Sequence, residues 1–394
     1  MSFFDKKTRI YGPVVLSGKN GFGLSGLFLL FFSVALFHNE VQSQISPRQT
    51  PTQAERAKAA AKPLVVDKQL FFQRAALGTI TAIHLAKTPA DSQTAFWIAA
   101  ERGAVSVTDS GKPLLSVRFE RMGGKVSPVD LEGDGNFEFL SRGGGQEEAC
   151  LYNREGGRLW KYGLGTDPAV REAACGDLDG DGWSECVLAM KGNGGLRLLD
   201  RNGRLRWTEP EQNVWNIEIL DWDGNGKNEI VYSNFAGQLR IRDGDGKIRT
   251  ELPGNNYITL FSLCRWPDAD SGWFILSNNK FSGIQLYDFK GKHVDSVPAP
   301  VKGYEVLGTP VRFEADGLYY FALLVCNSTP RRDSHLFIYN PEKEIIYQEK
   351  FFPPLAALRA VRDEGTGEEF LLVGEGEGRV WKYRLVPAGT RDSH

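Results

Sequence analysis

Short hydrophobic runs separated by glycine, aspartate and asparagine dominate the chain from about residue 78 onward. The clearest stretch begins at Asn216 and reads NIEIL, an acidic loop, EIVYS, a turn, QLRIR, a second turn and KIRTEL. Short runs rich in Ile, Val and Tyr that are bounded by turn residues are typical of β-strands. Four such strands joined by short turns predict an antiparallel meander.

An acidic, glycine-rich loop followed by a hydrophobic run occurs in three clear copies. They read DLEGDGNFEFL from Asp130, DLDGDGWSECVL from Asp177 and DWDGNGKNEIVY from Asp221, so the loop recurs after 47 and then 44 residues. A period in this range indicates stacked structural units, each one a small meander that buries its faces against its neighbours.

A tight turn is the second landmark of the repeat. Its copies lie at Gly111, Gly156, Gly203, Gly246, Gly291 and residues 340–347. Projecting the period in both directions finds four further strand sets, around residues 95–102, 273–279, 319–326 and 369–376. Together with the three clear copies they predict an all-β fold, a seven-bladed β-propeller of four-stranded antiparallel blades.

The last unit shows only three strands, which end in RVWKYRL. The run PLVVDKQLFF, which begins at Pro63, has no other place in the repeat. We expect it to supply the missing strand and to close the ring from the N-terminal side, because closure removes the exposed edges of open sheets. The predicted propeller covers residues 63–385, forms a monomeric ring and precedes a flexible tail at 386–394.

Each acidic loop carries oxygen-bearing side chains at positions 1, 3, 5 and 9. They are Asp130, Glu132, Asp134 and Glu138; Asp177, Asp179, Asp181 and Glu185; and Asp221, Asp223, Asn225 and Glu229. Ca²⁺ binds oxygen ligands, and the backbone carbonyl of position 7, which is Trp183 in the second loop, would add another. An acid at position 9 followed at once by a strand excludes a helix–loop–helix calcium hand. The sequence therefore predicts up to three Ca²⁺ sites.

Turn formation is the alternative explanation of these loops, because Asp, Asn and Gly tolerate the positive φ angles of tight turns. Three copies in register, each with the acid at position 9, favour metal binding. The loops at Asp268 and Asp363 lack part of the ligand set, and we expect both to be structural. Asp243 and Asp245 lie at the other turn of their blade and are interpreted as hairpin residues.

The pattern D-x-[DE]-G-[DN]-G-x-x-E at the start of a strand resembles the calcium loop of FG-GAP or VCBS-type repeats, found in the integrin α-subunit propeller and in many exported bacterial proteins. The resemblance covers about residues 78–383 as a repeat and implies calcium ligands at the three loops listed above. The turn D/N-x-x-G-x-x-x-W, which ends at Trp160 and Trp207, looks like the blade turn of quinoprotein-like propellers, including the scaffold propeller of outer-membrane protein assembly. That likeness implies that both tryptophans pack between blades and do not bind a ligand.

The N-terminal region has the features of an export or anchoring signal. Four basic residues within the first twenty precede the uncharged segment GFGLSGLFLLFFSVALF at 21–37. Its length lies between a signal-peptide core of about 7–15 residues and a membrane-spanning helix of about 20. Residues 1–43 are therefore a signal peptide cleaved after Ser43 or an apolar helix that stays in the membrane, and 44–62 form a polar tether. Both alternatives place the propeller outside the cytoplasm, in the periplasm or the extracellular space.

Composition narrows the possible functions. A formal net charge of −2 argues against a nucleic-acid partner. Only five histidines occur, and no G-x-S-x-G or H-E-x-x-H motif is present, so an enzyme is not the first expectation. The five cysteines are odd in number and irregularly spaced, which predicts that most of them are small buried hydrophobes rather than parts of a disulfide framework.

These observations predict a calcium-binding propeller that acts as a non-catalytic protein-interaction or scaffold module. A polysaccharide lyase or quinone-dependent dehydrogenase on the same scaffold, and a glycan-binding lectin, are the alternatives. The candidate ligand loop is the insertion CNSTPRRDSH with Arg331 and Arg332, because long loops on rigid scaffolds often carry function. A solvated polar loop without such a role is the other interpretation of this insertion.

Overall fold

The structure is a computed structural model. It describes residues 64–87, 94–119, 125–142, 148–163, 169–252, 258, 260–265, 273–279, 283–303, 305–313, 318–327, 333–352, 357–362 and 369–388. The expected N-terminal helix, the tether and residues 328–332 of the candidate ligand loop, which include Arg331 and Arg332, lie outside these residues, as do Asp268 and Asp363. Within the described ranges, no helix is long and apolar enough to span a membrane.

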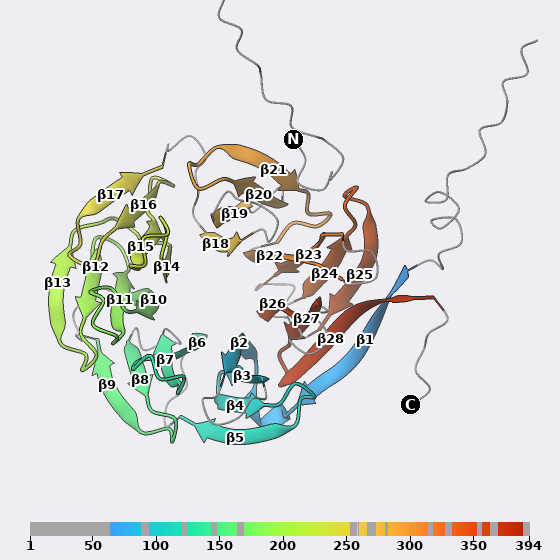
Figure 1. The fold of residues 1–394 in the computed structure, drawn as a ribbon, viewed down its shortest axis with the longest axis horizontal. Helices are drawn as coiled ribbons and strands as arrows, with labels where there is room; N and C mark the ends of the chain where they lie inside the picture. Colours follow the sequence, from blue (N-terminus) through green and yellow to red (C-terminus); the bar gives the residue numbers. More distant parts are fainter. Residues whose placement is uncertain are drawn as a thin grey trace, which may run out of the picture. The chain divides into compact units, whose positions relative to one another are not determined.

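In the described residues the chain forms seven four-stranded antiparallel sheets arranged in a ring (Figure 1). The first three blades are β2 (Ile80–Lys87), β3 (Thr94–Ala100), β4 (Gly103–Val107) and β5 (Pro113–Arg118); β6 (Lys125–Val129), β7 (Glu138–Arg142), β8 (Ala149–Tyr152) and β9 (Arg158–Tyr162); and β10 (Val170–Gly176), β11 (Glu185–Met190), β12 (Leu196–Leu199) and β13 (Leu205–Glu209). The next three are β14 (Asn216–Leu220), β15 (Glu229–Ser233), β16 (Leu239–Arg242) and β17 (Ile248–Glu251); β18 (Leu260–Arg265), β19 (Trp273–Asn279), β20 (Gly283–Tyr287) and β21 (His293–Val297); and β22 (Glu305–Val311), β23 (Tyr320–Cys326), β24 (Ser334–Tyr339) and β25 (Ile345–Phe351). The predicted seven-bladed propeller is confirmed.

The seventh blade is built from both ends of the described chain. Its strands are β26 (Ala357–Arg362), β27 (Glu369–Gly374), β28 (Arg379–Pro387) and β1 (Leu64–Gln73), with β1 on the outside. The antiparallel register pairs Leu64 with Pro387 and Gln73 with Arg379. The predicted closure by an N-terminal strand is therefore confirmed, and Figure 1 shows β1 lying beside β28. A 3-10 turn, η1 (Ala75–Leu77), then leads into the first blade.

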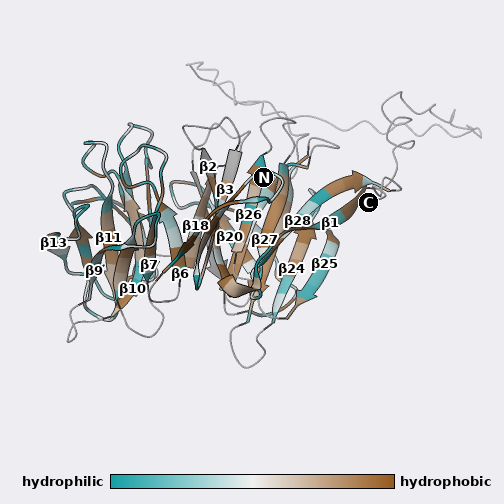
Figure 2. Cartoon of the chain, turned by 90° about the horizontal axis from the view of Figure 1, so that it is seen from below, coloured by the Kyte–Doolittle hydropathy of each residue, from teal (hydrophilic) through white to brown (hydrophobic). Residues whose placement is uncertain are grey.

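Burial follows the position of a strand within its blade. The second strands β11 and β15 are buried along their whole length, whereas every residue of the outermost strand β17 is exposed. Both faces of a second strand are covered because blades pack face to face around the ring, as when Trp97 of one blade meets Phe139 of the next with ring centroids 5.0 Å apart. Figure 2 shows the same gradient, with hydrophobic colouring on β27 and hydrophilic colouring on β25.

The glycine turn between the third and fourth strands makes the contact from blade to blade. Gly203 has φ +77°, and a Cβ atom placed on it would lie 2.6 Å from Cγ of Trp160, which belongs to the preceding blade. Trp207 repeats the arrangement one blade later, where its Nε1 donates a hydrogen bond of 2.9 Å to the carbonyl oxygen of Gly244. The two tryptophans thus pack between blades, as the resemblance to quinoprotein-like turns implied.

Substitution of Gly203 by alanine tests this contact. We expect Gly203→Ala to lower the free energy of unfolding by about 1–2 kcal/mol for the left-handed backbone and by a further ~1–3 kcal/mol for crowding of the indole. Gly192→Ala is the matched control, because Gly192 also has positive φ but has no atom within 4 Å of an added Cβ. Urea denaturation of both variants measures the difference, and equal losses would contradict the packing role of the turn.

Candidate functional site

The three acidic loops lie at equivalent places in three consecutive blades. They connect the innermost strand of each blade to the second strand, over residues 130–137 between β6 and β7, 177–184 between β10 and β11, and 221–228 between β14 and β15. Position 9 of each loop is a glutamate, and it is the first residue of β7, β11 or β15. Each loop therefore leads directly into a strand. The fold thus brings the predicted ligands together on neighbouring blades.

The aspartate at position 1 organises the backbone of each loop. One carboxylate oxygen of Asp177 accepts a hydrogen bond of 3.0 Å from the N–H of Gly182, and the other accepts one of 2.7 Å from the N–H of Gly180. Asp221 repeats both bonds, to Gly226 and Gly224. In the first loop Asp130 accepts from the N–H of residues 134 and 135. Such bonds wrap the chain around the carboxylate. The side chains at positions 3 and 5 of the second loop also accept backbone N–H groups, Asp179 from residue 181 and Asp181 from residue 183.

The glutamate at position 9 is held against the start of each loop. Its Oε2 accepts a hydrogen bond from the backbone N–H of position 2, at 3.2 Å for Glu138, 3.0 Å for Glu185 and 2.9 Å for Glu229. Burial raises the pKa of all three carboxyl groups, that of Glu138 to about 7, and neighbouring loop acids add to the effect. A cation beside these groups would favour their ionised forms.

Two of the three loops bring carboxylates close enough to share one cation. One carboxylate oxygen from each of Asp177, Asp179 and Asp181 lies within 4.8 Å of the others, and the same holds for Asp221, Asp223 and Glu229. The four acids of the first loop are all described, and no three of them meet this limit. The donor set is oxygen throughout, which fits a hard cation such as Ca²⁺.

Arg206 lies beside the second loop, and no sequence pattern indicated that it would. It extends from β13 and places Nη1 2.8 Å from Oδ2 of Asp179 and 3.4 Å from Oε1 of Glu185. The hydrogen bond from Arg206 lowers the pKa of Asp179. The guanidinium therefore already balances part of the negative charge of this loop. In the third blade's turn Arg206 precedes Trp207, whereas the same place in the second blade is Leu159, so no repeated pattern marks it.

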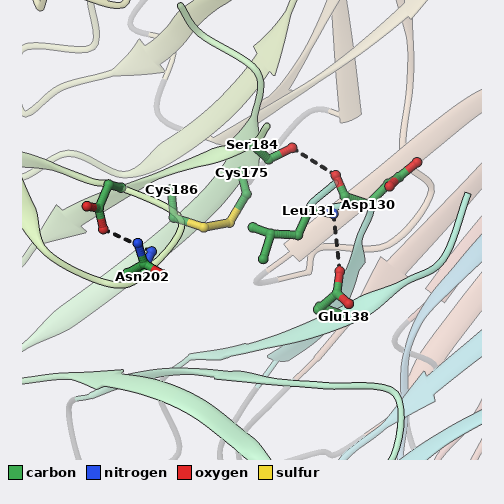
Figure 3. Close-up of a disulfide and its surroundings, with 8 residues drawn as sticks. Asp130, Leu131, Glu138, Cys175, Ser184, Cys186 and Asn202 are labelled. Atoms are coloured by element: carbon green, nitrogen blue, oxygen red, sulfur yellow. Dashed lines mark hydrogen bonds between the residues drawn. A yellow bond between two sulfur atoms is a disulfide. The ribbon is translucent and has the colours of Figure 1, made fainter. Parts of the chain in front are cut away.

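Hydrogen bonds link the three loops into one continuous arc. Ser184, at position 8 of the second loop, donates from Oγ to the carbonyl oxygen of Asp130 at 2.8 Å, as Figure 3 shows. Asn228, at position 8 of the third loop, donates from Nδ2 to the carbonyl oxygen of Asp177 at 2.9 Å. Position 8 of the first loop is Phe137, which packs against an apolar cluster instead. The polar residue at position 8 of the second and third loops is the sequence feature that could have indicated these hydrogen bonds.

The remaining residues that the sequence analysis singled out near these loops are Trp183, Asp243 and Asp245. The indole ring of Trp183, at position 7 of the second loop, is covered by the guanidinium of Arg201 at 3.9 Å from its centroid. Asp243 accepts the backbone N–H of Lys247 at 2.8 Å across its turn, which confirms the hairpin interpretation of this residue. The side chain of Asp245 is exposed at the same turn.

Two of the cysteines form a disulfide beside the second loop. Cys175 of β10 and Cys186 of β11 face each other across the strand pair, with Cα atoms 4.1 Å apart (Figure 3). The expectation that the cysteines act mainly as small hydrophobes is corrected for this pair, because antiparallel pairing at the base of the loop brings the two side chains together. Cys150 and Cys264 are half-buried free thiols, and Cys326 is half-buried.

Comparison with solved structures identifies the same fold in other proteins. BBS1N in complex with ARL6DN, from a crystal soaked with lead, is similar to this chain with a TM-score of 0.53 and 12% identity, covering 82% of this chain and 98% of that one. The same complex from a crystal soaked with mercury gives 0.54 and 13%, with equal coverage. The Neurospora crassa Pan2 WD40 domain gives 0.49 and 15%, covering 80% of this chain and 95% of that one.

Sequence comparisons give no family for this chain. No family model matches the sequence, and no curated protein matches it. Because the two BBS1N likenesses lie below 25% identity, they identify the β-propeller fold alone.

The ion pair of Arg206 leads to a direct test. In chelator-treated protein, we expect Arg206→Gln to raise the pKa of Asp179 toward its usual value, because the charged donor is lost. Carboxyl chemical shifts followed by NMR across a pH titration measure this change. The pKa of Asp134 serves as the internal reference, because it is lowered by the backbone N–H of Asn136 and not mainly by an arginine. An unchanged Asp179 would show that Arg206 does not control the charge of the loop.

Proposed function

We propose that this protein is a calcium-stabilised β-propeller that acts as a non-catalytic binding module for another protein outside the cytoplasm. The observation that carries the proposal is the set of three acidic loops on consecutive blades, each held by the same aspartate and glutamate hydrogen bonds. They are the loops for which the sequence resembles FG-GAP or VCBS-type repeats.

Calcium would be held by the side-chain oxygens of each loop. In the second loop these belong to Asp177, Asp179, Asp181 and Glu185, with the carbonyl of Trp183, and in the third loop to Asp221, Asp223, Asn225 and Glu229. The ion would neutralise carboxylates that repel one another, and it would join the start of the second strand to the end of the first. Because the loops are bonded to each other through Ser184 and Asn228, binding at one loop would stiffen its neighbours.

Protein binding is supported by the fold and by a structural neighbour. The neighbour BBS1N is described in complex with ARL6DN, which is an instance of this ring carrying a protein partner. A rigid propeller offers loops from many blades on one surface, and binding residues often lie on such loops. The arc of acidic loops is a fixed, negatively charged part of that surface, and a partner with basic side chains would complement it.

An exported location is supported by two features of the chain. The uncharged segment 21–37 follows a basic N-terminal flank, and Cys175 is bonded to Cys186. Disulfides persist mainly in oxidising compartments such as the periplasm and the extracellular space. The ring is then positioned outside the cytoplasm whether the N-terminal segment is cleaved or retained.

Thermal unfolding with and without calcium tests the metal sites. We expect Ca²⁺ at about one hundred times its Kd to stabilise the ring by about 2.7 kcal/mol per occupied site, seen as a rise of several degrees in Tm that a chelator reverses. Asp221→Asn combined with Asp223→Asn should remove the contribution of the third loop.

The control variant is Asp245→Asn, which changes an exposed acid at a turn outside the three loops. It should keep the full calcium response. A Tm that is the same in calcium and in chelator would refute calcium binding, and Mg²⁺ should give a smaller shift because it demands octahedral geometry with several waters.

A crosslinked pull-down tests the interaction role separately. The full-length protein is exposed to crosslinker in its native compartment, with calcium and with chelator, and the captured chains are identified by mass spectrometry. We expect a defined partner whose recovery falls in chelator and in the Asp221→Asn, Asp223→Asn variant. Equal recovery of the same chains by an unrelated propeller would count against a specific partner.

A further inference from the structure

A cavity of about 400 Å³ lies on the axis of the ring. Most of its lining comes from the innermost strands of all seven blades, β2, β6, β10, β14, β18, β22 and β26, which surround the centre in Figure 1. The second strands β7 and β19 add Leu140, Arg142 and Leu276. Ligand sites in proteins commonly have volumes of about 300–1,000 Å³ and combine apolar walls with a few convergent polar groups. The axial cavity has this size.

The wall of the cavity is divided into a charged arc and an apolar arc. Blades seven, one, two, three and four contribute the titratable side chains, which are Arg359, His84, Lys125, Arg142, Glu172 and Glu218. The fifth and sixth blades complete the circle with Leu260, Val306 and Leu307. A molecule in the cavity would therefore meet charge on one side and hydrocarbon on the other.

Part of the charged arc is neutralised internally. Arg142 forms an ion pair with Glu172, and Nζ of Lys125 lies 4.0 Å from the other oxygen of the same carboxylate. Nε of Arg142 is buried and has no hydrogen-bond partner. Two cationic side chains of the lining thus face the same carboxylate.

Arg359 and Glu218 make up the rest of the charged arc. Among the described residues, the guanidinium of Arg359 makes no ion pair and no hydrogen bond. Burial, with a contribution from Glu172, raises the pKa of Glu218 to about 7, while the positive charges of Arg142, Lys125 and Arg359 act in the opposite direction. Burial lowers the pKa of His84 to about 4, which keeps the imidazole neutral. Among the side chains that line the cavity, three cations face two carboxyl groups, which gives the lining a net positive charge. Arg359 is exposed and makes no direct ion pair in the described residues, and Glu218 interacts with it only at longer range.

We propose that the axial cavity binds a small organic carboxylate whose apolar ring or chain lies against Leu260, Val306 and Leu307 while Arg359 holds the carboxylate. Guanidinium and carboxylate match in a bidentate geometry. Arg359 makes no ion pair among the described residues, so one carboxylate on the ligand is enough to pair it. The apolar arc rules out a ligand that is polar on all sides, because burying its polar groups there would leave them without partners.

The test uses 1-naphthoate as the probe and 1-naphthamide as its neutral isostere, with binding measured by isothermal titration calorimetry on the full chain. We expect saturable binding of one naphthoate per protein and at least tenfold weaker binding of the amide. Arg359→Gln should weaken naphthoate at least tenfold and leave the amide unchanged. Arg362→Gln is the matched control, because Arg362 lies on the same strand, is exposed and does not line the cavity.

Three results would overturn the proposal. They are no saturable binding of naphthoate, equal affinities for naphthoate and naphthamide in the unchanged protein, or equal effects of the Arg359 and Arg362 substitutions. The comparison of the two probes needs no variant and so remains decisive if Arg359→Gln fails to fold. None of these results depends on calcium, because the measurement is made both with calcium and with chelator.

Discussion

Closure of the ring depends on the pairing of β1 with β28, which joins segments more than three hundred residues apart along the chain. The same strand also contacts the blades on either side. Phe71 meets Phe96 of the first blade with ring centroids 5.7 Å apart. Lys68 bonds to Glu349 of the sixth blade at 2.5 Å and lies 4.0 Å from the centroid of the Trp381 ring. One strand thus completes the seventh blade and contacts both of its neighbours, in addition to the contacts that β26 makes with β2 and β22.

Blade-to-blade contacts explain why the sequence repeats at two landmarks and not at one. The acidic loop and the glycine turn each meet the neighbouring blade, through Ser184 and Asp130 in the first case and through Gly203 and Trp160 in the second. A residue that must fit its own blade and the next one is constrained twice, so its spacing is kept even where the hydrophobic residues between vary. The period in the sequence therefore reflects the geometry of stacking as much as that of the single meander.

The fold could be predicted from the sequence because its determinants are local and repeated. Strand runs, turn glycines and the acid at position 9 each occur within one unit, and PLVVDKQLFF was recognisable as the strand left over. The sequence could not reveal which residues on different strands meet in three dimensions. Arg206 reaches Asp179 from another strand, Cys175 meets Cys186 only through the strand register, and Arg359 and Glu218 belong to the seventh and fourth blades and share the axis only once the ring closes. None of these pairs has a spacing that repeats.

The acidic loops and the charged groups of the cavity lie toward opposite ends of β10 and closer together on β14. Glu172 precedes Asp177 by five residues along β10, whereas Glu218 precedes Asp221 by three along β14. Five residues of extended strand span about 16 Å, which is longer than the screening length of ~8–10 Å at ordinary salt. Charge changes at the second loop are therefore weakly felt by Glu172 through space. Any coupling between the two ends of β10 would have to travel through its backbone, whose register is already fixed by the buried second strand β11.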